Sequence, residues 1–386
     1  MTRRPEPEKI HLPDKMKYSC LMCGHGCTDF WEIPVESESE SRLSEYDLKK
    51  HQQRAQDRPP FVESEFEPGE KALCREHDTC TFLTDDKKCA LHTALGPYEK
   101  PQACIDFPWR YIETPDGPYV GLSFACTAVL QDWGEAVEVQ SARIKQNYRH
   151  SVHVNRPAER LMLTGRVAID FEAYLELEKA FDEILSIPNT PLGLRLLAQH
   201  EFLNMAKNGM EAARLGSSLK GSLTEEEREA ASNAQDVTII RGLAERARAE
   251  QWGRMIARAQ SRPVSPALNR AFIGLVTTFR QAFWRGATRV TAMVYILQRY
   301  ANHALQMGRV HLQPNEKRFR YSEFKFRRPD LSPGSYAERL LTRYFRHVLF
   351  RKDMLLADSL FMAHRLMLMH YALAYWYLVS EMVERD

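Results

Sequence analysis

The chain has 386 residues, of which 44% are hydrophobic and 10% aromatic, enough for roughly two or three folded domains. Its 53 basic and 51 acidic residues leave a formal net charge of +2, which argues against nucleic acid or an anionic membrane as the main partner. No apolar segment follows the basic amino terminus, so we expect a cytoplasmic protein rather than an exported one.

All eight cysteines lie between Cys20 and Cys126. In a reducing compartment, clustered thiols are more often metal ligands or redox groups than disulfides. This distribution predicts one or two metal sites in the first third of the chain. The candidate ligands are Cys20, Cys23, Cys27, Cys74, Cys80, Cys89, Cys104 and Cys126.

Before Cys74 we predict short secondary-structure elements separated by irregular segments. Residues 1–17 are polar and contain prolines, so we expect a flexible arm that docks late. The apolar run Phe30–Val35 predicts an edge strand, because its proline limits pairing. An acidic Glu/Ser loop is predicted at 36–41, a helix from 42 to about 55, and irregular structure over 61–72.

A β-hairpin is predicted after Cys104. Its strands are Trp109–Glu113 and Tyr119–Ala125, and the turn is Pro115-Asp-Gly-Pro118. An Asp-Gly pair supplies the positive φ that a tight turn needs.

From Asp170 onward the apolar residues follow a helical period. Capping boxes at Ser222–Glu225 and Ser335–Glu338 predict the starts of two further helices. Between them, 267–286 and 288–307 are predicted as a helical pair.

The last apolar run, Met354–Val379, is predicted as a buried core helix and not as a membrane span. Its longest stretch without a formal charge, Leu366–Ser380, is shorter than the roughly 20 residues that cross a bilayer. The fold class we expect is therefore mainly α. A small irregular α+β cysteine-rich metal domain (18–130) follows the arm (1–17) and packs on an all-helical domain (131–386).

The first cysteines form a Cys-x2-Cys-x3-Cys loop, in which Gly24 and Gly26 allow the chain to fold around an ion. Thiolates suit zinc and iron–sulfur clusters equally, so the spacing indicates a metal but not which one. One site would use four ligands and leave four over, whereas two sites would use all eight. His25, His77 and His92 lie beside the cysteines, where histidines are more often outer-sphere or solvated groups than ligands.

Two similar patterns are excluded. The radical S-adenosylmethionine loop has cysteines spaced x3 then x2, the reverse of this order, and no alternation of strands and helices follows. Gly24-His-Gly26 is not a dinucleotide fingerprint, because no strand precedes it and no glycine follows at the required offset.

Several segments together resemble the zinc- or iron-chelating cysteine-cluster family, and within it the flagellin lysine-N-methylases. The motifs are Cys80-Thr-Phe-Leu83, Cys89-Ala-Leu-His92, Pro101-Gln-Ala-Cys104-Ile-Asp-Phe-Pro108, Leu122-Ser-Phe-Ala-Cys126 and, more loosely, Glu338–Phe350. This sequence departs from the family in one respect. The first cluster usually ends in a Cys-Cys doublet, whereas here Cys27 lies between Gly26 and Thr28, so one expected thiolate is missing.

The resemblance implies an iron–sulfur protein, with a [4Fe-4S] cluster, that uses S-adenosylmethionine to methylate lysines of a protein substrate such as flagellin. Methylation needs a neutral amine and a route for its proton. The candidate catalytic residues are Asp106, Arg110 and Tyr111. Trp31 and Trp109 are candidate walls of the cofactor pocket. For each of these residues a structural role, as an i,i+4 ion pair or as core, is the more common alternative.

Two further functions fit the same cysteines. One is a non-enzymatic zinc- or iron-binding module whose helical domain binds a protein partner, and the other is a redox or metal-delivery protein. The oligomeric state is not predicted by any feature of the sequence.

Overall fold

The computed structural model describes residues 4–28, 31–65, 67–151, 153–217, 225–250, 252–261, 309–312, 317–320 and 328–384. The chain divides into two units. Unit 1 holds Met1–Ala158 and His347–Leu356, and unit 2 holds Glu159–Arg346 and Ala357–Asp386. The division therefore falls later than the expected boundary near residue 130, and it assigns a short C-terminal segment to the cysteine-containing unit.

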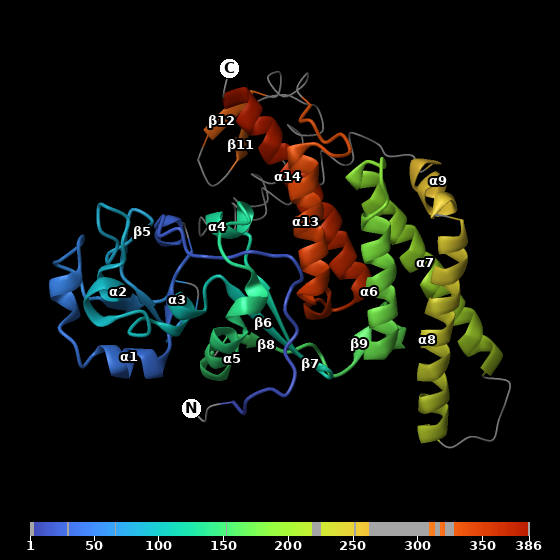
Figure 1. The fold of residues 1–386 in the computed structure, drawn as a ribbon, viewed down its shortest axis with the longest axis horizontal. Coiled ribbons are helices and arrows are strands. Elements are labelled where there is room, and N and C mark those ends of the chain that lie inside the picture. Colours follow the sequence, from blue (N-terminus) through green and yellow to red (C-terminus); the bar gives the residue numbers. More distant parts are fainter. Residues whose placement is uncertain are drawn as a thin grey trace, which may run out of the picture. The chain divides into compact units, whose positions relative to one another are not determined.

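Unit 1 is built from short helices and three small sheets (Figure 1). Its elements are η1 (His25–Cys27), β1 (Pro34–Val35), α1 (Ser37–Leu43), η2 (Leu48–His51), β2 (Phe61–Glu63), β3 (Lys71–Leu73), β4 (Arg75–Glu76), β5 (Thr79–Cys80), α2 (Ala90–Leu95), α3 (Gln102–Asp106), β6 (Trp109–Thr114), β7 (Gly117–Leu122), α4 (Thr127–Leu130), η3 (Val137–Gln140), α5 (Ser141–His150), β8 (Val154–Asn155) and η4 (Asp353–Leu356). The sheets have the orders β1-β3-β2, β4-β5 and β7-β6-β8.

The first part of unit 1 differs from the sequence prediction in three places. The helix predicted from 42 to about 55 does not form, because α1 ends at Leu43 and only the short 3-10 helix η2 follows it. The Glu/Ser run predicted as a loop is helix α1, because Glu38 and Glu40 favour a helix N-terminus and Leu43 is buried below it. The segment predicted as irregular contains β2 and β3, which pair in antiparallel register from Phe61 opposite Leu73. Among the described residues of the strand predicted over Phe30–Val35, only Pro34–Val35 form a strand, β1, and it lies at the edge of its sheet as expected.

The β6–β7 hairpin is confirmed, with Trp109 opposite Leu122 and Thr114 opposite Gly117. Gly117 adopts φ 116, the conformation that the Asp-Gly turn requires. One face of the hairpin packs into a core that α4, η3 and α5 complete. Its buried members are Met16, Trp109, Tyr111, Val120, Leu122, Val129, Val137, Ile144 and Tyr148.

The amino-terminal segment, expected to be flexible, lies along the edge of this hairpin (Figure 1, dark blue). The His11 amide donates to the Pro118 carbonyl at 2.9 Å, and the Val120 amide donates to the His11 carbonyl at 2.9 Å. The His11 ring stacks on Tyr119 with 4.0 Å between ring centroids. These contacts extend the sheet by one bridge and cover an edge that would otherwise be open.

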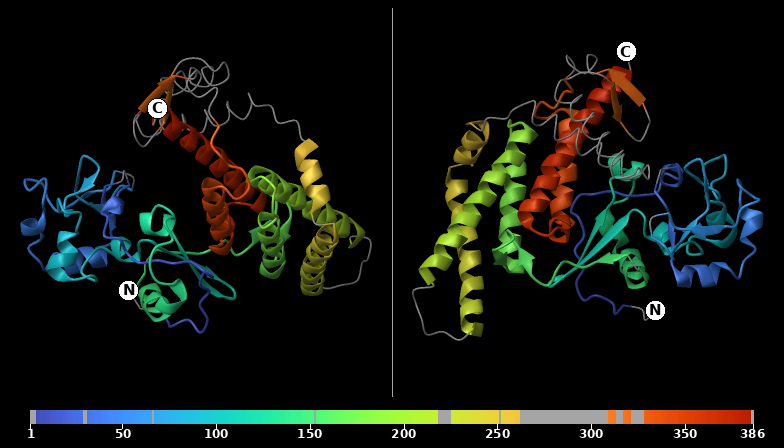
Figure 2. Two further views of the ribbon diagram at one scale, coloured as in Figure 1. Left: turned by 45° about the horizontal axis from the view of Figure 1, so that its top comes forward. Right: turned by 180° about the vertical axis from the view of Figure 1, so that it is seen from behind.

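Among its described residues, unit 2 is dominated by long helices and also carries two small antiparallel sheets, so it is not all helical. Its elements are β9 (Leu161–Met162), β10 (Ala168–Ile169), α6 (Phe171–Leu185), α7 (Leu192–Ser217), α8 (Glu225–Ala249), α9 (Gly253–Ser261), β11 (Arg309–Leu312), β12 (Lys317–Arg320), α13 (Tyr336–Phe350) and α14 (Leu360–Glu384). Helices α6, α7 and α8 pack side by side in both views of Figure 2. The coarse prediction of a helix-rich chain with small sheets is confirmed.

Local signals fix the starts of several helices. Asp170 caps α6, since its carboxylate accepts from the Ala173 amide at 2.6 Å. Ser335 caps α13, since its hydroxyl accepts from the Glu338 amide at 3.3 Å. Helix α8 begins at Glu225, but its predicted cap Ser222 lies outside the described residues, as does the predicted helical pair 267–286 and 288–307.

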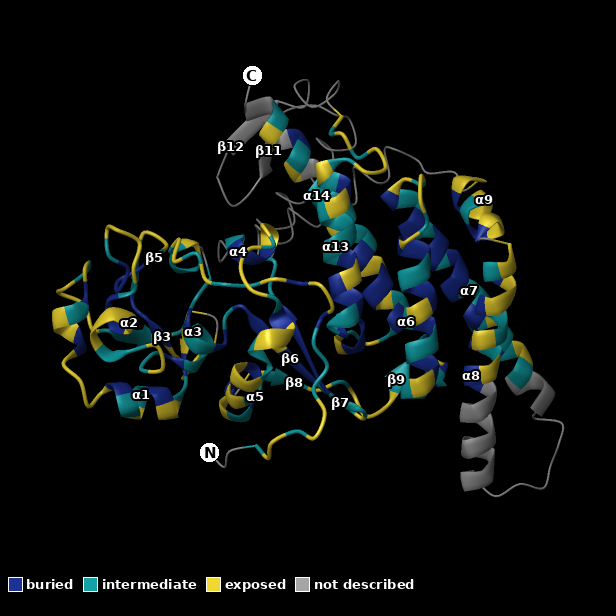
Figure 3. Cartoon of the chain, in the orientation of Figure 1, coloured by how far each residue is buried: buried dark blue, intermediate teal, exposed yellow. Residues whose placement is uncertain are grey.

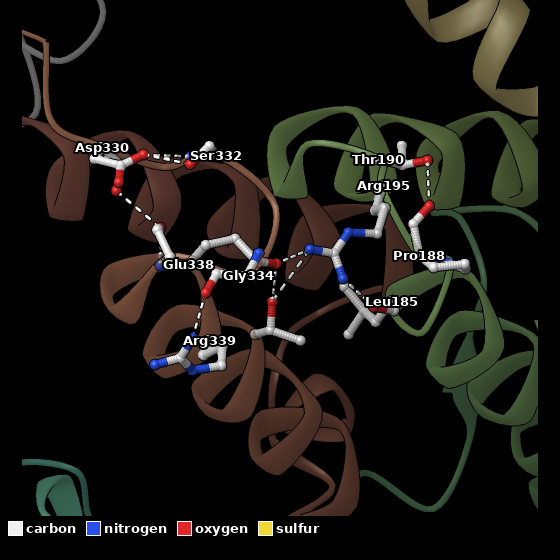
Figure 4. A network of polar contacts seen from close by, with 11 residues as sticks. Leu185, Pro188, Thr190, Arg195, Asp330, Ser332, Gly334, Glu338 and Arg339 are labelled. Carbon is white, nitrogen blue, oxygen red and sulfur yellow. Dashed lines mark hydrogen bonds and ion pairs between the residues drawn. The ribbon is translucent and has the colours of Figure 1, made fainter.

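A buried ion pair links α7 to α13 (Figure 4). Arg195 donates to Glu338 Oε1 and to the Leu185 carbonyl, and both charged side chains are 6% exposed. Thr342 Oγ1 donates to the same carboxylate oxygen at 2.8 Å, and the Gly334 amide donates to Oε2 at 3.1 Å. The capping glutamate therefore also carries a tertiary contact.

The final helix, α14, buries one side and exposes the other (Figure 3). Leu360, His364 and Met367 are buried, whereas Met362 and Leu366 are exposed. Within the parts of the chain that the structure describes, no helix is both long and apolar enough to cross a membrane. The predicted core helix therefore starts later than Met354, after η4, and only part of its surface is core.

Candidate metal centre

The first cysteine loop is fixed at both ends. Before it, the Ser19 amide donates to the Trp133 carbonyl at 2.8 Å, and the Glu135 amide donates to Ser19 Oγ at 3.2 Å. At its far end the Cys27 amide donates to the Gly24 carbonyl at 2.9 Å and closes η1. Cys20 and Cys23 are exposed and Cys27 is half-buried.

Gly24 is the position where the loop changes direction. It adopts φ 67, and a Cβ atom there would lie 3.0 Å from Leu83 Cδ1 and 3.2 Å from the Lys87 carbonyl oxygen. Both the left-handed backbone and the close approach favour glycine. This contact brings Cys27 toward the turn that separates Cys80 from Cys89.

Four cysteines gather there on separate elements: Cys27 in η1, Cys80 in β5, Cys89 before α2 and Cys104 in α3. All four belong to or pack against one apolar cluster. Its buried members are Ile33, Val35, Leu43, Leu48, Leu73, Cys80, Phe82 and Leu91. We call these four cysteines the four-thiol group.

The thiols of the four-thiol group act on one another electrostatically. Burial first, and then the Cys89 thiolate, raises the pKa of Cys27 to about 11. Burial raises the pKa of Cys80 to about 12, with further contributions from Cys27 and Cys89. For Cys104, burial and the other three thiolates raise the pKa well above its ordinary value. A bound metal cation would lower the pKa values of these thiols, because it stabilises thiolates that would otherwise repel one another.

A second set of cysteines forms where the loop begins. Burial, followed by the thiolates of Cys20 and Cys23, raises the pKa of Cys126, which directly precedes α4. Burial and the charges of Cys20 and Cys126 raise the pKa of Tyr18, which also shares a hydrogen bond with Cys20. We call Cys20, Cys23 and Cys126 the three-thiol group.

Cys74 belongs to neither group. It is buried, and burial raises its pKa, but its charged neighbours are Arg58, Glu76 and Asp57. Among the spare histidines, burial and the charges of Lys100 and Arg143 lower the pKa of His92.

The cysteines of each group are neighbours, but their thiols do not form a ready coordination sphere for a metal ion. Among the described residues, no three His, Cys, Asp or Glu side chains are arranged so that they can hold a metal ion. Electrostatic interaction between thiolates extends well beyond a zinc–sulfur bond of about 2.3 Å. The donor types and their number therefore fit a soft metal, whereas ligand geometry would require the thiols to close in.

The candidate catalytic residues are separated by the sheet. Asp106 ends α3 and is buried, with one carboxylate oxygen accepting from Gln102 at 2.9 Å and the other from Ser151 at 2.6 Å. Burial raises its pKa to about 6. Tyr111 lies in the hairpin core, and its hydroxyl has no hydrogen-bond partner among the described residues.

Arg110 is exposed and, in the alternating pattern of β6, points to the face opposite Tyr111. It does not pair with Asp106, because the helix ends at Asp106 and the chain has already turned into β6.

The two tryptophans proposed as cofactor walls have different surroundings. Trp109 is 5% exposed and meets Tyr18 edge to face, so it is part of the core. Trp31 is half-buried, its indole donates to the Gly26 carbonyl at 3.1 Å, and its ring contacts Phe107. Trp31 therefore fixes the first cysteine loop against the segment that follows Cys104.

One polar network was not foreseen. His153 Nε2 lies 2.7 Å from Glu36 Oε1, and the other Glu36 oxygen accepts from the Gln102 amide at 3.1 Å. The Glu36 contact raises the pKa of His153. Together with the Ser151–Asp106 hydrogen bond, these contacts hold α3, and no local motif in the sequence marks them.

No protein-family model, curated protein or solved structure matches the chain.

Proposed function

We propose that this protein is an iron–sulfur enzyme that transfers methyl groups from S-adenosylmethionine to lysine side chains of a protein, flagellin or a similar filament protein. The observation that supports the proposal is that Cys27, Cys80, Cys89 and Cys104 belong to or pack against one apolar cluster, whereas Cys20 and Cys23 are exposed and act electrostatically on Cys126. Four thiolates complete the ligand set of a structural metal. Three thiolates leave one position of a [4Fe-4S] cluster without a protein ligand, as a cofactor-binding cluster requires.

The two groups have the exposure that these roles need. The four-thiol group is enclosed by apolar side chains, which suits a metal that stabilises the fold. Cys20 and Cys23 of the three-thiol group are exposed, so a cofactor and a protein substrate can approach them. When bound, a cluster there supplies an open iron position for a donor atom of the cofactor.

The remaining chemistry falls to the chain itself. Methyl transfer breaks the sulfur–carbon bond of the sulfonium and forms a nitrogen–carbon bond to a neutral lysine amine, which releases a proton to solvent. We assign Asp106 and Trp31 as positioning residues. Asp106 holds α3 through Ser151, and Trp31 holds the first loop through Gly26. Tyr111 and Trp109 belong to the hairpin core.

A non-enzymatic metal module is the second candidate, because the enclosed four-thiol group alone would account for a purely structural zinc. Metal and sulfide analysis of anaerobically purified protein separates the two. Visible iron–sulfur absorption, with roughly four irons and four sulfides per cluster, is expected for the enzyme. Colourless protein with stoichiometric zinc and no iron would instead establish the metal module.

Cysteine variants test the grouping itself. We expect Cys126→Ser to lose both cluster absorption and calorimetric binding of S-adenosylmethionine. Cys104→Ser should lower the stability of unit 1 and its total metal content. Cys74→Ser is the matched control, since Cys74 lies outside both groups, and it should keep metal and cofactor binding. Loss of the cluster in Cys74→Ser with retention in Cys126→Ser would contradict the assignment.

A further inference from the structure

The second face of the β6–β7 hairpin carries a cluster of positive charge. Arg110 and Gly121 are directly opposite each other in the antiparallel register, so their side-chain positions share one face. A Cβ atom on Gly121 would lie 2.6 Å from Arg351 Cγ and 3.0 Å from His347 Nε2. The Arg351 side chain thus fills the space above Gly121 and lies beside Arg110.

The segment His347–Leu356 is fixed on this face by further contacts. His347 Nε2 accepts from the Leu122 amide at 2.7 Å, and Arg351 Nη1 donates to the Leu122 carbonyl at 2.8 Å. Lys352, which is 1% exposed, places its ammonium 4.0 Å from the centre of the Tyr119 ring. All these partners lie within unit 1.

The charges on this face are only partly compensated. Arg351 forms a two-point ion pair with Asp353, with 2.8 Å between Nε and Oδ1. The Arg110 guanidinium, by contrast, makes no hydrogen bond or ion pair with any residue that the structure describes, although it is exposed enough to meet a ligand. Partial burial and the neighbouring Arg351 charge lower the pKa of Arg110, and Asp353 opposes this only in part.

An oxyanion beside Arg110 would relieve this repulsion, and the planar guanidinium is suited to bind a carboxylate through two hydrogen bonds. The strand that carries Gly121 continues through Leu122 into a turn, closed by the Cys126 amide on the Ser123 carbonyl at 3.1 Å. The strand that forms part of the cationic face therefore leads, within five residues of Gly121, to Cys126 of the three-thiol group.

We propose that Arg110, supported by Arg351, forms an oxyanion site that binds the carboxylate of S-adenosylmethionine. The identity of the ligand rests on the proposed function, whereas the oxyanion site does not. The positive sulfonium is repelled by the same charges, so the cofactor binds with its carboxylate toward Arg110 and its methyl group away from it.

Two measurements on the full chain test the two parts separately, each with wild type, Arg110→Gln and the control Arg156→Gln. Arg156 is an exposed arginine of the same unit, paired with Glu113, and its substitution changes the net charge equally. Circular dichroism establishes that all three are folded. The first measurement is the thermal midpoint in sodium sulfate against sodium chloride at equal ionic strength. Sulfate should raise the midpoint of wild type and Arg156→Gln more than that of Arg110→Gln, and an equal response overturns the oxyanion site.

The second measurement compares calorimetric binding of S-adenosylmethionine with that of its decarboxylated form. Wild type should prefer the carboxylated cofactor by about 10- to 100-fold, the value of one charge-assisted pair, and Arg110→Gln should lose this preference. Preference retained in Arg110→Gln overturns the assignment of the carboxylate. If neither form binds while the sulfate response depends on Arg110, the proposed function fails and the oxyanion site stands.

Discussion

The buried pair between Arg195 and Glu338 gives the sharpest stability prediction for unit 2. Both side chains are 6% exposed, and the carboxylate also accepts from Thr342 and Gly334. Removing one member of such a pair leaves the other charge buried without compensation, which costs about 3–5 kcal/mol. We therefore expect Arg195→Met and Glu338→Leu each to lower the free energy of unfolding of unit 2 by about that amount.

A double-mutant cycle isolates the pair. The variant that carries both substitutions replaces two buried charges by apolar groups, so it should lose less than the sum of the single effects. We expect a coupling free energy of about 2–3 kcal/mol, measured by urea denaturation and followed by far-ultraviolet circular dichroism, which reports on the long helices of unit 2. Additivity within about 0.5 kcal/mol would refute the reasoning.

The exposed pair of Arg346 with Asp182 is the matched control, because it also joins α13 to another helix, α6, through two hydrogen bonds of 2.7 and 2.8 Å. Its side chains are 50% and 41% exposed. Water screens such a pair, so its coupling should stay at or below about 1 kcal/mol. A coupling as large as that of the buried pair would show that burial is not the decisive variable.

Two further predictions concern buried groups. Burial, and then the neighbouring His200, lowers the pKa of His364 from 6.5 to about 3, so the unfolded chain takes up a proton below pH 6.5 that the folded chain refuses. The contribution of His364 to the free energy of unfolding should be complete above pH 6.5 and fall toward pH 3, with a loss of about 1.4 kcal/mol at about pH 5.5. Denaturation of His364→Asn should lack this pH-dependent loss. In unit 1, Gly121→Val places atoms against Arg351 and should cost about 1–3 kcal/mol in denaturant unfolding, whereas Gly165→Ala in unit 2, which meets open space, should be near neutral. An unchanged midpoint for Gly121→Val would contradict the docking of the C-terminal segment.

Two features encoded within a few residues were predicted correctly from the sequence. The Asp-Gly turn set the β6–β7 hairpin, and the Ser335 hydroxyl marked the start of α13. Strands β2 and β3 were missed, because strands of three residues carry too little pattern and form only through pairing with each other and with β1.

The arrangement of charges could not be predicted, because it depends on residues far apart in the chain. Arg110 and Arg351 come together only because the hairpin leaves a glycine opposite Arg110 and the segment after α13 fills that space. Neither residue belongs to a motif. The Glu36–His153 contact has the same origin, since it joins the start of α1 to the chain that follows α5.

The Cys-x2-Cys-x3-Cys loop illustrates the difference most directly. Spacing alone predicted that its three thiols would surround one ion. In the structure the loop turns at Gly24, and Cys27 packs against the apolar cluster that also holds Cys80, Cys89 and Cys104, whereas Cys20 and Cys23 are exposed. Cys20 and Cys23 instead act on Cys126. Under the proposed function, the missing partner of the usual Cys-Cys doublet would be no deficit, because a cluster on the three-thiol group would need an open position and the four-thiol group would have four ligands without it.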